Sequence, residues 1–228
     1  MEALDGRDDP DPPEEESDAG ACRLFIVRHG TTTMNIQNRY RGRRDIPLDA
    51  QGYQDAVDAA RRLSTAGLTA VYTGPLRRTI ATAQIIADEA RVPDIRILHG
   101  LVNLDYGDWE GQTAEEAEVY DPAAFDLYRT DPERAMCPNG ERLRDATDRM
   151  IEAMELIGSR HQGEAVAAVS HAVMIRLAVA RLNSVVGEAW RAPVGRGSVT
   201  GFHIGPDGTI SLVHAPSGGV PDSAPTSG

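Results

Sequence analysis

The chain has 228 residues, which is enough for one well-buried domain with a small cap and too few for two ordinary domains. All 23 basic residues are arginine, and the absence of lysine excludes a Walker A P-loop, a pyridoxal-phosphate Schiff base and a lysine-dependent aldolase. The formal net charge is −12, and neither half of the chain has a large basic face, so we expect no nucleic-acid partner.

Both ends of the chain are predicted to be disordered tails. Residues 1–20 hold nine Asp or Glu residues and one Arg, and such a segment cannot bury enough apolar surface to order itself. Residues 215–228 are rich in Pro, Ser and Gly, a composition that is typical of a flexible tail. We therefore expect one domain over residues 21–214.

No apolar run approaches membrane-spanning length, and the acidic N-terminus lacks the basic segment that begins an export signal. The two cysteines have no CxxC spacing, and Cys22 is expected to be a small core residue. We therefore expect no membrane partner and a cytoplasmic location. The sequence leaves the oligomeric state open.

Strands and helices are predicted to alternate along the domain. In chain order we expect a strand at 22–27, a helix from a turn at 48–52 to about 64, a strand at 68–73, a helix opened by Pro75, a strand at 95–98, an irregular cap or lid at 103–139 with short helical pieces, a helix at 141–160, a buried strand at 165–170, a helix to about 182, and a hairpin of 199–204 and 210–214. This alternation predicts a three-layer α/β/α sandwich with a mostly parallel sheet.

Two of the predicted strands end at a histidine. The first strand leads into Arg28 and His29, and the strand at 165–170 leads into His171. Neighbouring parallel strands end at the same edge of a sheet, where ligands bind in open α/β folds, so the two imidazoles could share one crevice. Arg78 lies in the first turn of the helix after the second strand, at that same edge.

This combination of residues suits a phosphoryl group. Arg28 can bind phosphate oxygens, Gly30 permits close approach of the backbone, and His29 can attack phosphorus. No Asp, Glu or Cys at metal-ligand spacing accompanies the histidines, and the arginines would repel a cation, so we expect no metal and no other cofactor. The alternative interpretation is a set of scattered cations at solvated strand ends.

Five motifs in chain order resemble those of the histidine phosphatase superfamily, in its phosphoglycerate mutase-like branch. They are Arg28-His29-Gly30 with Asn35, the run from Gly42 to Gly52, the run from Tyr72 to Ala83, the run from Asp105 to Gly111, and Ser170-His171. The similarity covers roughly residues 23–204.

The resemblance implies roles for individual residues. His29 would be the nucleophile that becomes a phosphohistidine, Arg28 and Arg78 would hold the phosphoryl oxygens, and His171 would stabilise the group in transfer. A small phosphorylated molecule is the implied substrate. The residues expected to contact it are Gly30, Thr31, Asn35, Arg41, Asn103 and Ala172.

The chain departs from the family pattern at several positions. Thr31 stands where Glu or Gln is frequent, and Ala172 stands where Gly is frequent. Asn103 occupies the position of the family's general acid, and an amide cannot give a proton to a departing alkoxide. Asp105, two residues on, could replace that acid because alternate residues of an extended segment share a face. Otherwise the substrate has a leaving group that needs little help, or catalysis is weakened.

A metal-independent phosphomonoester hydrolase is the expected function. The alternatives are a phosphotransferase or mutase of the same fold and a phosphate-binding protein without turnover. The segment 112–139 has only two separated arginines, Arg129 and Arg134, which favours water over a retained acceptor. Glu110 and Glu141 could serve as proton donors, but we expect them to bind backbone groups around the cap. His161 is expected to compensate a helix dipole or to be solvated.

Overall fold

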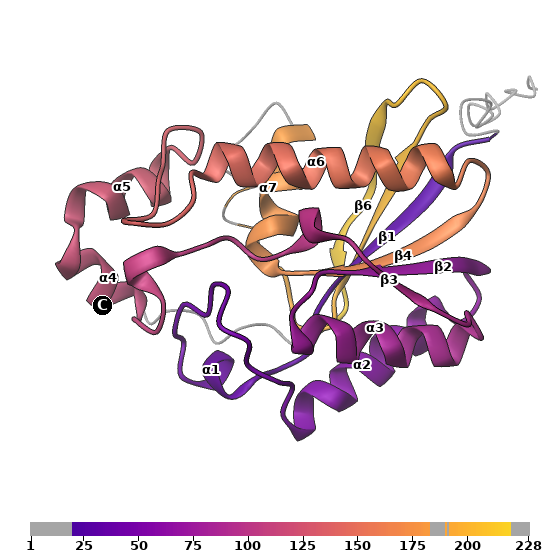
Figure 1. Cartoon of the computed structure of the whole chain (residues 1–228), viewed down its shortest axis with the longest axis horizontal. Coiled ribbons are helices and arrows are strands. Elements are labelled where there is room, and N and C mark those ends of the chain that lie inside the picture. Colours follow the sequence, from indigo (N-terminus) through magenta and orange to yellow (C-terminus); the bar gives the residue numbers. More distant parts are fainter. Residues whose placement is uncertain (1–19, 183–189, 191, 220–228) are drawn as a thin grey trace, which may run out of the picture.

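The computed structural model describes residues 20–182, 190 and 192–219, so most of both expected tails, 1–19 and 220–228, lies outside the described residues. A six-stranded sheet with the order β3-β2-β4-β1-β5-β6 forms the centre (Figure 1). The strands are β1 (Cys22–Arg28), β2 (Leu68–Thr73), β3 (Ile95–Ile97), β4 (Ala165–Ser170), β5 (Val199–Ile204) and β6 (Ile210–Ser217).

The sheet is mostly parallel, as predicted. Strand β4 lies between β1 and β2 and pairs with both in parallel, and β2 pairs with β3 in parallel. The hairpin of β5 and β6 adds to β1 in the antiparallel sense. In the register of β1 and β4, Arg28 is opposite Ser170, so the two strands end side by side.

Helices cover both faces of the sheet, which confirms the predicted three-layer sandwich. Alternate residues of β1 point to opposite faces: Leu24 and Ile26 belong to the apolar core with α6 and α7, whereas Val27 belongs to the core with α2 and α3. The helices are α1 (Thr33–Ile36), α2 (Ala50–Leu63), α3 (Arg77–Ala90), α4 (Ala114–Tyr120), α5 (Pro122–Thr130), α6 (Leu143–Arg160) and α7 (Ala172–Leu182), with short 3₁₀ turns η1 (His99–Leu101) and η2 (Gly107–Trp109).

Some element boundaries differ from those predicted. Helix α6 begins at Leu143 rather than Glu141, because the Glu141 backbone N–H binds the Asp105 carbonyl and Met136 and Arg142 form a β-bridge. Strand β6 continues to Ser217, which pairs with Val199, so the expected boundary at residue 214 is three residues too early.

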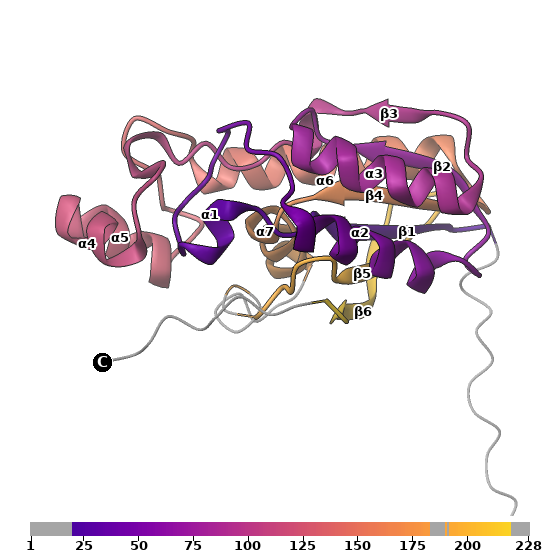
Figure 2. The same ribbon diagram turned by 90° about the horizontal axis from the view of Figure 1, so that it is seen from below.

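The segment 103–139 extends beyond the C-terminal ends of the parallel strands (Figures 1 and 2). Its helices α4 and α5 are anchored by aromatic packing, since Trp109 is fully buried with its ring centroid 5.8 Å from that of Phe125 and 5.6 Å from that of Tyr128. Buried aromatic contacts of this kind give the cap an apolar core continuous with the main one.

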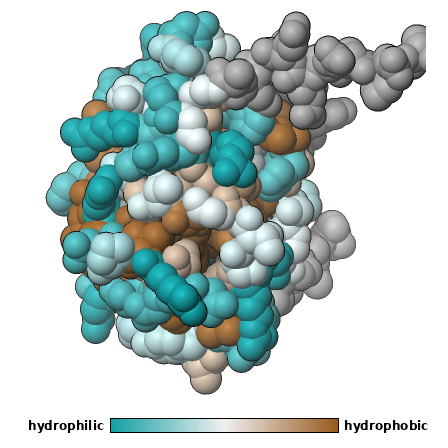
Figure 3. All heavy atoms as spheres, turned by 90° about the vertical axis from the view of Figure 1, so that its right-hand side faces the viewer, coloured by the Kyte–Doolittle hydropathy of each residue, from teal (hydrophilic) through white to brown (hydrophobic). Residues whose placement is uncertain are grey.

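The opposite end of the sheet has a surface in which hydrophilic residues surround hydrophobic ones (Figure 3). His161, at the end of α6, is buried there: its Nδ1 lies 2.6 Å from Glu164 Oε2 and its Nε2 lies 3.1 Å from the Tyr72 hydroxyl. The expectation that His161 is solvated is therefore wrong, because the buried Tyr72 supplies a partner that the local sequence does not reveal. None of the helices in the described part of the chain is long and apolar enough to cross a membrane.

Candidate active site

The structure brings His29 and His171 together at the ends of β1 and β4. The His29 backbone N–H donates to the Ser170 carbonyl at 3.1 Å, and the two imidazole centroids are 5.1 Å apart with an interplanar angle of 63°. Both side chains are almost completely buried. His29 and His171 are 142 positions apart in the chain. They come into edge-to-face contact because β1 and β4 pair in parallel in this register.

His29 is held as a neutral imidazole with a defined tautomer. Its Nδ1 lies 2.6 Å from the Gly30 carbonyl oxygen, and because a carbonyl only accepts, we assign the proton to Nδ1. Burial, and then the positive charges of Arg78, Arg41 and Arg28, hold the pKa of His29 well below its ordinary value. Nε2 therefore carries a free lone pair at neutral pH.

His171 is also held neutral. Burial is the main cause of its lowered pKa, followed by the charges of Arg78, His29, Arg41 and Arg149. Neither of its ring nitrogens has a hydrogen-bond partner among the residues that the structure describes. A buried polar atom without a partner costs about 1–3 kcal/mol, so a polar ligand at this position would stabilise the site.

Two arginines that flank the histidines are fully buried. Arg78, in the first turn of α3, donates to the carbonyl oxygens of Arg44 at 2.7 Å and Gly42 at 2.9 Å. Burial lowers its pKa to about 10, so it stays protonated at neutral pH. Arg28 donates to the Val194 carbonyl. Because carbonyl oxygens do not neutralise a guanidinium, Arg78 keeps its positive charge in the site, which favours an oxyanion.

The loop after His29 is fixed against the start of α2. A Cβ on Gly30 would lie 2.1 Å from the Gly52 carbonyl oxygen, so only glycine fits. Thr31 donates from its backbone N–H at 2.9 Å and its hydroxyl at 2.5 Å to Asp55 Oδ2. Asn35 Oδ1 accepts from the backbone and hydroxyl of Thr32, which caps α1. Thr31 and Asn35 thus have structural hydrogen bonds near the site.

Asn103 is buried beside Arg78. Its Nδ2 donates to the Gly42 carbonyl at 3.0 Å, the oxygen that also accepts from Arg78. This contact sets the orientation of the amide, and Asn103 Oδ1 has no hydrogen-bond partner among the described residues. The backbone carbonyl of Asn103 accepts from Arg149 at 3.1 Å. Ala172 is the first residue of α7, where backbone N–H groups lack acceptors within the helix.

The carboxylates near Asn103 are paired with arginines. Asp105 accepts from the Gly107 N–H at 3.0 Å and lies 3.4 Å from Arg43. Glu141 binds Arg149 at 2.8 and 3.0 Å and accepts from the Asp105 N–H. Burial raises the pKa of Glu141, but the Arg149 hydrogen bonds and charge outweigh it, so the net pKa lies below its usual value. Glu141 therefore binds the backbone around the cap, as expected from the sequence.

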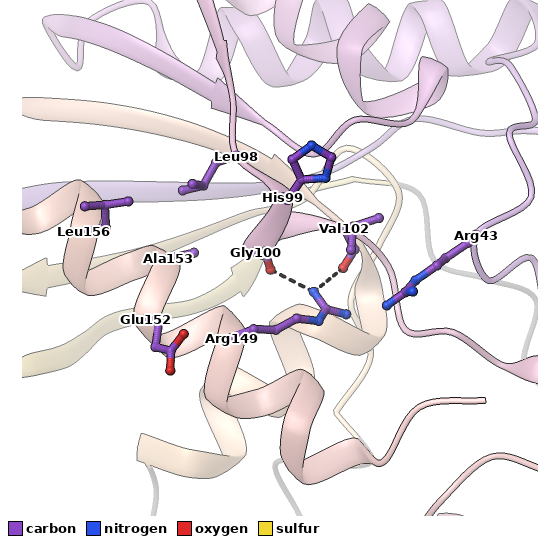
Figure 4. Close-up of a pocket in the computed structure, with 9 residues that line it drawn as sticks. All are labelled: Arg43, Leu98, His99, Gly100, Val102, Arg149, Glu152, Ala153 and Leu156. Carbon is purple, nitrogen blue, oxygen red and sulfur yellow. Dashed lines mark hydrogen bonds between the residues drawn. The ribbon is translucent and has the colours of Figure 1, made fainter. Parts of the chain in front are cut away.

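Arg149 is a residue of this region that the sequence interpretation missed. It lies on α6 and donates to the carbonyls of Gly100 at 2.8 Å and Val102 at 2.7 Å, which fastens the segment before Asn103 (Figure 4). Arg149 and Arg43 also line a cavity of about 560 Å³ between η1 and α6. A lone arginine in a helix gives no sequence signal that its partners are loop carbonyls about 50 residues away.

Metal binding finds no support in the described ranges 20–182, 190 and 192–219, where no group of three His, Cys, Asp or Glu side chains is placed to hold a metal ion. The chemistry that this arrangement allows is nucleophilic: His29 has an unprotonated imidazole nitrogen, lies close to the charges of three arginines and contacts a second neutral imidazole. Fixed cations stabilise the charge that develops on a phosphoryl group during transfer.

Comparison with known proteins agrees with this chemistry. Residues 24–215 match the model of the histidine phosphatase superfamily, branch 1. Phosphoserine phosphatase 1 of Hydrogenobacter thermophilus is 32% identical over 154 residues, which cover 68% of this chain and 72% of the relative. Phosphoglycerate mutase-like protein 4 of Arabidopsis thaliana is 31% identical over 164 residues, or 71% of each chain.

A solved structure shares the fold as a whole. Bacillus stearothermophilus YhfR superposes with a TM-score of 0.77 at 34% identity, covering 85% of this chain and 96% of that one. The matched region contains both strand ends that carry the histidines. The chain belongs to branch 1 of the histidine phosphatase superfamily and is a phosphatase.

Proposed function

We propose that this chain is a metal-independent phosphomonoester hydrolase that works through a phosphohistidine on His29. The observation that carries the proposal is the His29 Nδ1 contact with the Gly30 carbonyl, which leaves Nε2 unprotonated among arginine side chains. A small phosphorylated substrate is supported by the relative named phosphoserine phosphatase 1. Membership of the superfamily supports phosphatase activity. The contact of His29 Nδ1 with the Gly30 carbonyl supports a phosphohistidine intermediate on Nε2.

The first step is in-line attack of His29 Nε2 on phosphorus. Arg28 and Arg78 bind the equatorial oxygens, and the unpartnered ring of His171 donates a hydrogen bond to one of them. Gly30 allows the loop to approach closely, Ala172 supplies a backbone N–H at the start of α7, and Arg41 adds positive charge beside His29. Thr31 and Asn35 hold the loop through the hydrogen bonds already described. Water then cleaves the nitrogen–phosphorus bond.

The leaving oxygen takes its proton from Asp105 or from solvent in this scheme. The oxygens of the Asp105 carboxylate are engaged by Arg43 and by the Gly107 N–H, which favours solvent. The Asn103 amide has no proton that a leaving alkoxide could take. This feature also supports the alternative that the chain binds phosphate compounds without turnover.

Transfer to water rather than to a second substrate is favoured by the cap. Its two arginines, Arg129 and Arg134, are exposed and lie 3.9 Å from Glu118 and Asp131 respectively. Their charges are therefore partly neutralised, and they give little support to a clamp for a retained acceptor. A phosphotransferase would move labelled phosphate to an acceptor, whereas a hydrolase moves it to water.

The test uses an activated aryl phosphate as substrate. Turnover should persist in chelator, vanadate should inhibit, and a single turnover should leave an acid-labile phosphate on the protein. His29→Ala should abolish both turnover and labelling, while His99→Ala, at an exposed histidine outside the cluster, should change neither. Turnover that survives His29→Ala would overturn the proposal, and binding without any adduct would establish the alternative.

A further inference from the structure

Among the residues that the structure describes, the site has no group placed to give a proton to the departing part of the substrate. The described carboxylates near the cluster are bound within the protein through their own oxygen atoms. The pairs are Asp45 with Arg77, Asp55 with Thr31, Asp105 with Arg43, Glu110 with Arg44 and Glu141 with Arg149. Across the described residues, no carboxyl group forms a hydrogen bond with His29, His171 or Asn103.

The remaining titratable groups of the site are also unsuited to donate. His29 and His171 have pKa values well below the ordinary one, because burial and the arginine charges disfavour imidazolium. Glu141 has a pKa below its usual range and is ionised at neutral pH. Asn103, beside Arg78, directs its N–H at the Gly42 carbonyl, so its free atom is an acceptor. The described residues of the site can therefore stabilise negative charge, but none of them is suited to act as a general acid.

We propose that this site acts on phosphoryl groups whose bridging oxygen leaves as a stable anion, that is, on acyl phosphates and phosphoanhydrides rather than on phosphate esters of ordinary alcohols. The inference rests on the proposed phosphohistidine route through His29, and it changes the preferred substrate from phosphomonoesters in general to compounds with a more acidic leaving group. A carboxylate or phosphate oxygen departs without a proton, whereas an alkoxide needs one. The buried guanidinium groups of Arg28 and Arg78 meet the remaining requirement, which is neutralisation of the phosphoryl charge.

The steps balance without an acid. The lone pair of His29 Nε2 forms the bond to phosphorus, and the bond from phosphorus to the bridging oxygen breaks with its electrons on that oxygen, which leaves as an anion. Water then attacks phosphorus, and the nitrogen–phosphorus bond breaks with its electrons returning to Nε2. Both protons of the water stay on the inorganic phosphate, one on the new hydroxyl group and the other on a phosphoryl oxygen. The proton on Nδ1 stays there throughout and is donated in a hydrogen bond to the Gly30 carbonyl.

The first experiment uses the unmodified protein. Values of kcat/KM are measured for acetyl phosphate, for pyrophosphate, for aryl phosphates of graded phenol acidity and for glycerol phosphate, each corrected for spontaneous hydrolysis. We expect at least one of the two anhydrides to exceed glycerol phosphate by on the order of 10²–10⁴-fold, the usual contribution of acid catalysis, and the aryl series to fall steeply with decreasing phenol acidity. The faster anhydride identifies a carboxylate or a phosphate leaving group.

The second experiment supplies the acid. Asn103→Glu should raise the ratio of kcat/KM for glycerol phosphate to kcat/KM for the favoured anhydride by on the order of 10²–10⁴-fold, and it should introduce an alkaline limb into the pH profile for glycerol phosphate. Asn103→Gln has the same length as Asn103→Glu but no ionisable proton, so it should change neither that ratio nor the pH profile, whatever either substitution does to the packing beside Arg78.

Two failures can be told apart. If glycerol phosphate reacts as fast as both anhydrides and the aryl series is flat, a proton donor exists and the inference is wrong, while the proposed function stands. If His29→Ala hydrolyses acetyl phosphate as well as the unmodified protein does, the proposed function itself is wrong.

Discussion

Arg78 and Asn103 donate to the same oxygen atom, the carbonyl of Gly42, at 2.9 and 3.0 Å. The two side chains come from different parts of the chain, α3 and the segment after η1, and the loop carbonyl between them fixes both. The cation proposed to bind the phosphoryl group is therefore mechanically linked to the amide proposed to lie at the leaving group. A substitution of either side chain should therefore shift the position of the other.

Arg78 and its neighbour Arg77 offer a matched pair of substitutions. Arg78→Lys removes the planar fork that binds two carbonyls and the phosphoryl oxygens, and loss of one such donor costs on the order of 10²–10³ in kcat. Arg77 is exposed and pairs with Asp45, so Arg77→Lys should leave kcat unchanged. Steady-state kinetics on an aryl phosphate makes the comparison, and equal losses in both variants would argue against a role for Arg78 in the reaction.

Gly30 is expected to tolerate no side chain. In Gly30→Ala the added Cβ would lie 2.1 Å from the Gly52 carbonyl oxygen, and overpacking of this kind costs about 1–3 kcal/mol, occasionally more. The loop that carries His29 must move, so activity should fall together with the free energy of unfolding. Gly67→Ala has no neighbour within 4 Å and only an unfavourable φ of 68°; it should lose stability but keep its activity. Retained activity in Gly30→Ala would contradict this account of the loop.

Much of this fold could be predicted because apolar periodicity reports which face of an element is buried. The run at 165–170 is apolar throughout, as a strand between two helical layers must be, and it is buried at every position. The meeting of His29 and His171 follows from the rule that parallel strands end at one edge. Both predictions need only the order of elements and no tertiary detail.

Other features depended on contacts between distant segments. Helix α1 has four residues, too few for a periodic pattern, and is held by the Asn35 and Thr32 hydrogen bonds. The pairing of Asp105 with Arg43 joins two loops about 60 residues apart. Sequence similarity locates Asp105 and Asn103 near the site, but which oxygen or amide each side chain binds depends on how those loops approach.

The stability of the fold should fall in mild acid because of the two buried histidines. In the folded protein the pKa values of His29 and His171 lie well below 6.5. In the unfolded chain both are near 6.5. Between these values the unfolded chain binds more protons, so stability is full above about pH 6.5 and is lost as the pH falls, by up to about 1.4 kcal/mol per pH unit for each histidine.

Denaturant unfolding between pH 7.5 and 5.0 measures this dependence. His171→Asn removes one of the two groups and should reduce the slope by up to about 1.4 kcal/mol per pH unit. Activity should persist below pH 6.5, since His29 stays neutral there. A slope that is the same in the variant and in the unmodified protein would show that His171 does not carry a lowered pKa.

Glu141 should matter for both stability and catalysis although it is not proposed to touch the substrate. Glu141→Gln removes the charge that binds Arg149 at 2.8 and 3.0 Å, and hydrogen bonds between charged groups contribute about 1.5–3 kcal/mol. Arg149 fastens the carbonyls of Val102 and Asn103, so a looser Arg149 should displace the Asn103 amide and lower kcat more than it raises KM.

The control is a surface pair of similar geometry. Glu116 binds Arg39 at 2.7 Å with side chains that are 50% and 35% exposed respectively. Solvent screens surface pairs of this kind, so Glu116→Gln should leave stability and kcat almost unchanged. The effect of Glu141→Gln also has a pH signature. The folded pKa of Glu141 lies below its unfolded value of 4.5, so its contribution is present above pH 4.5 and is lost as the pH falls through the folded value. If the two variants unfold alike at pH 7, the arginine network does not support the Asn103 segment.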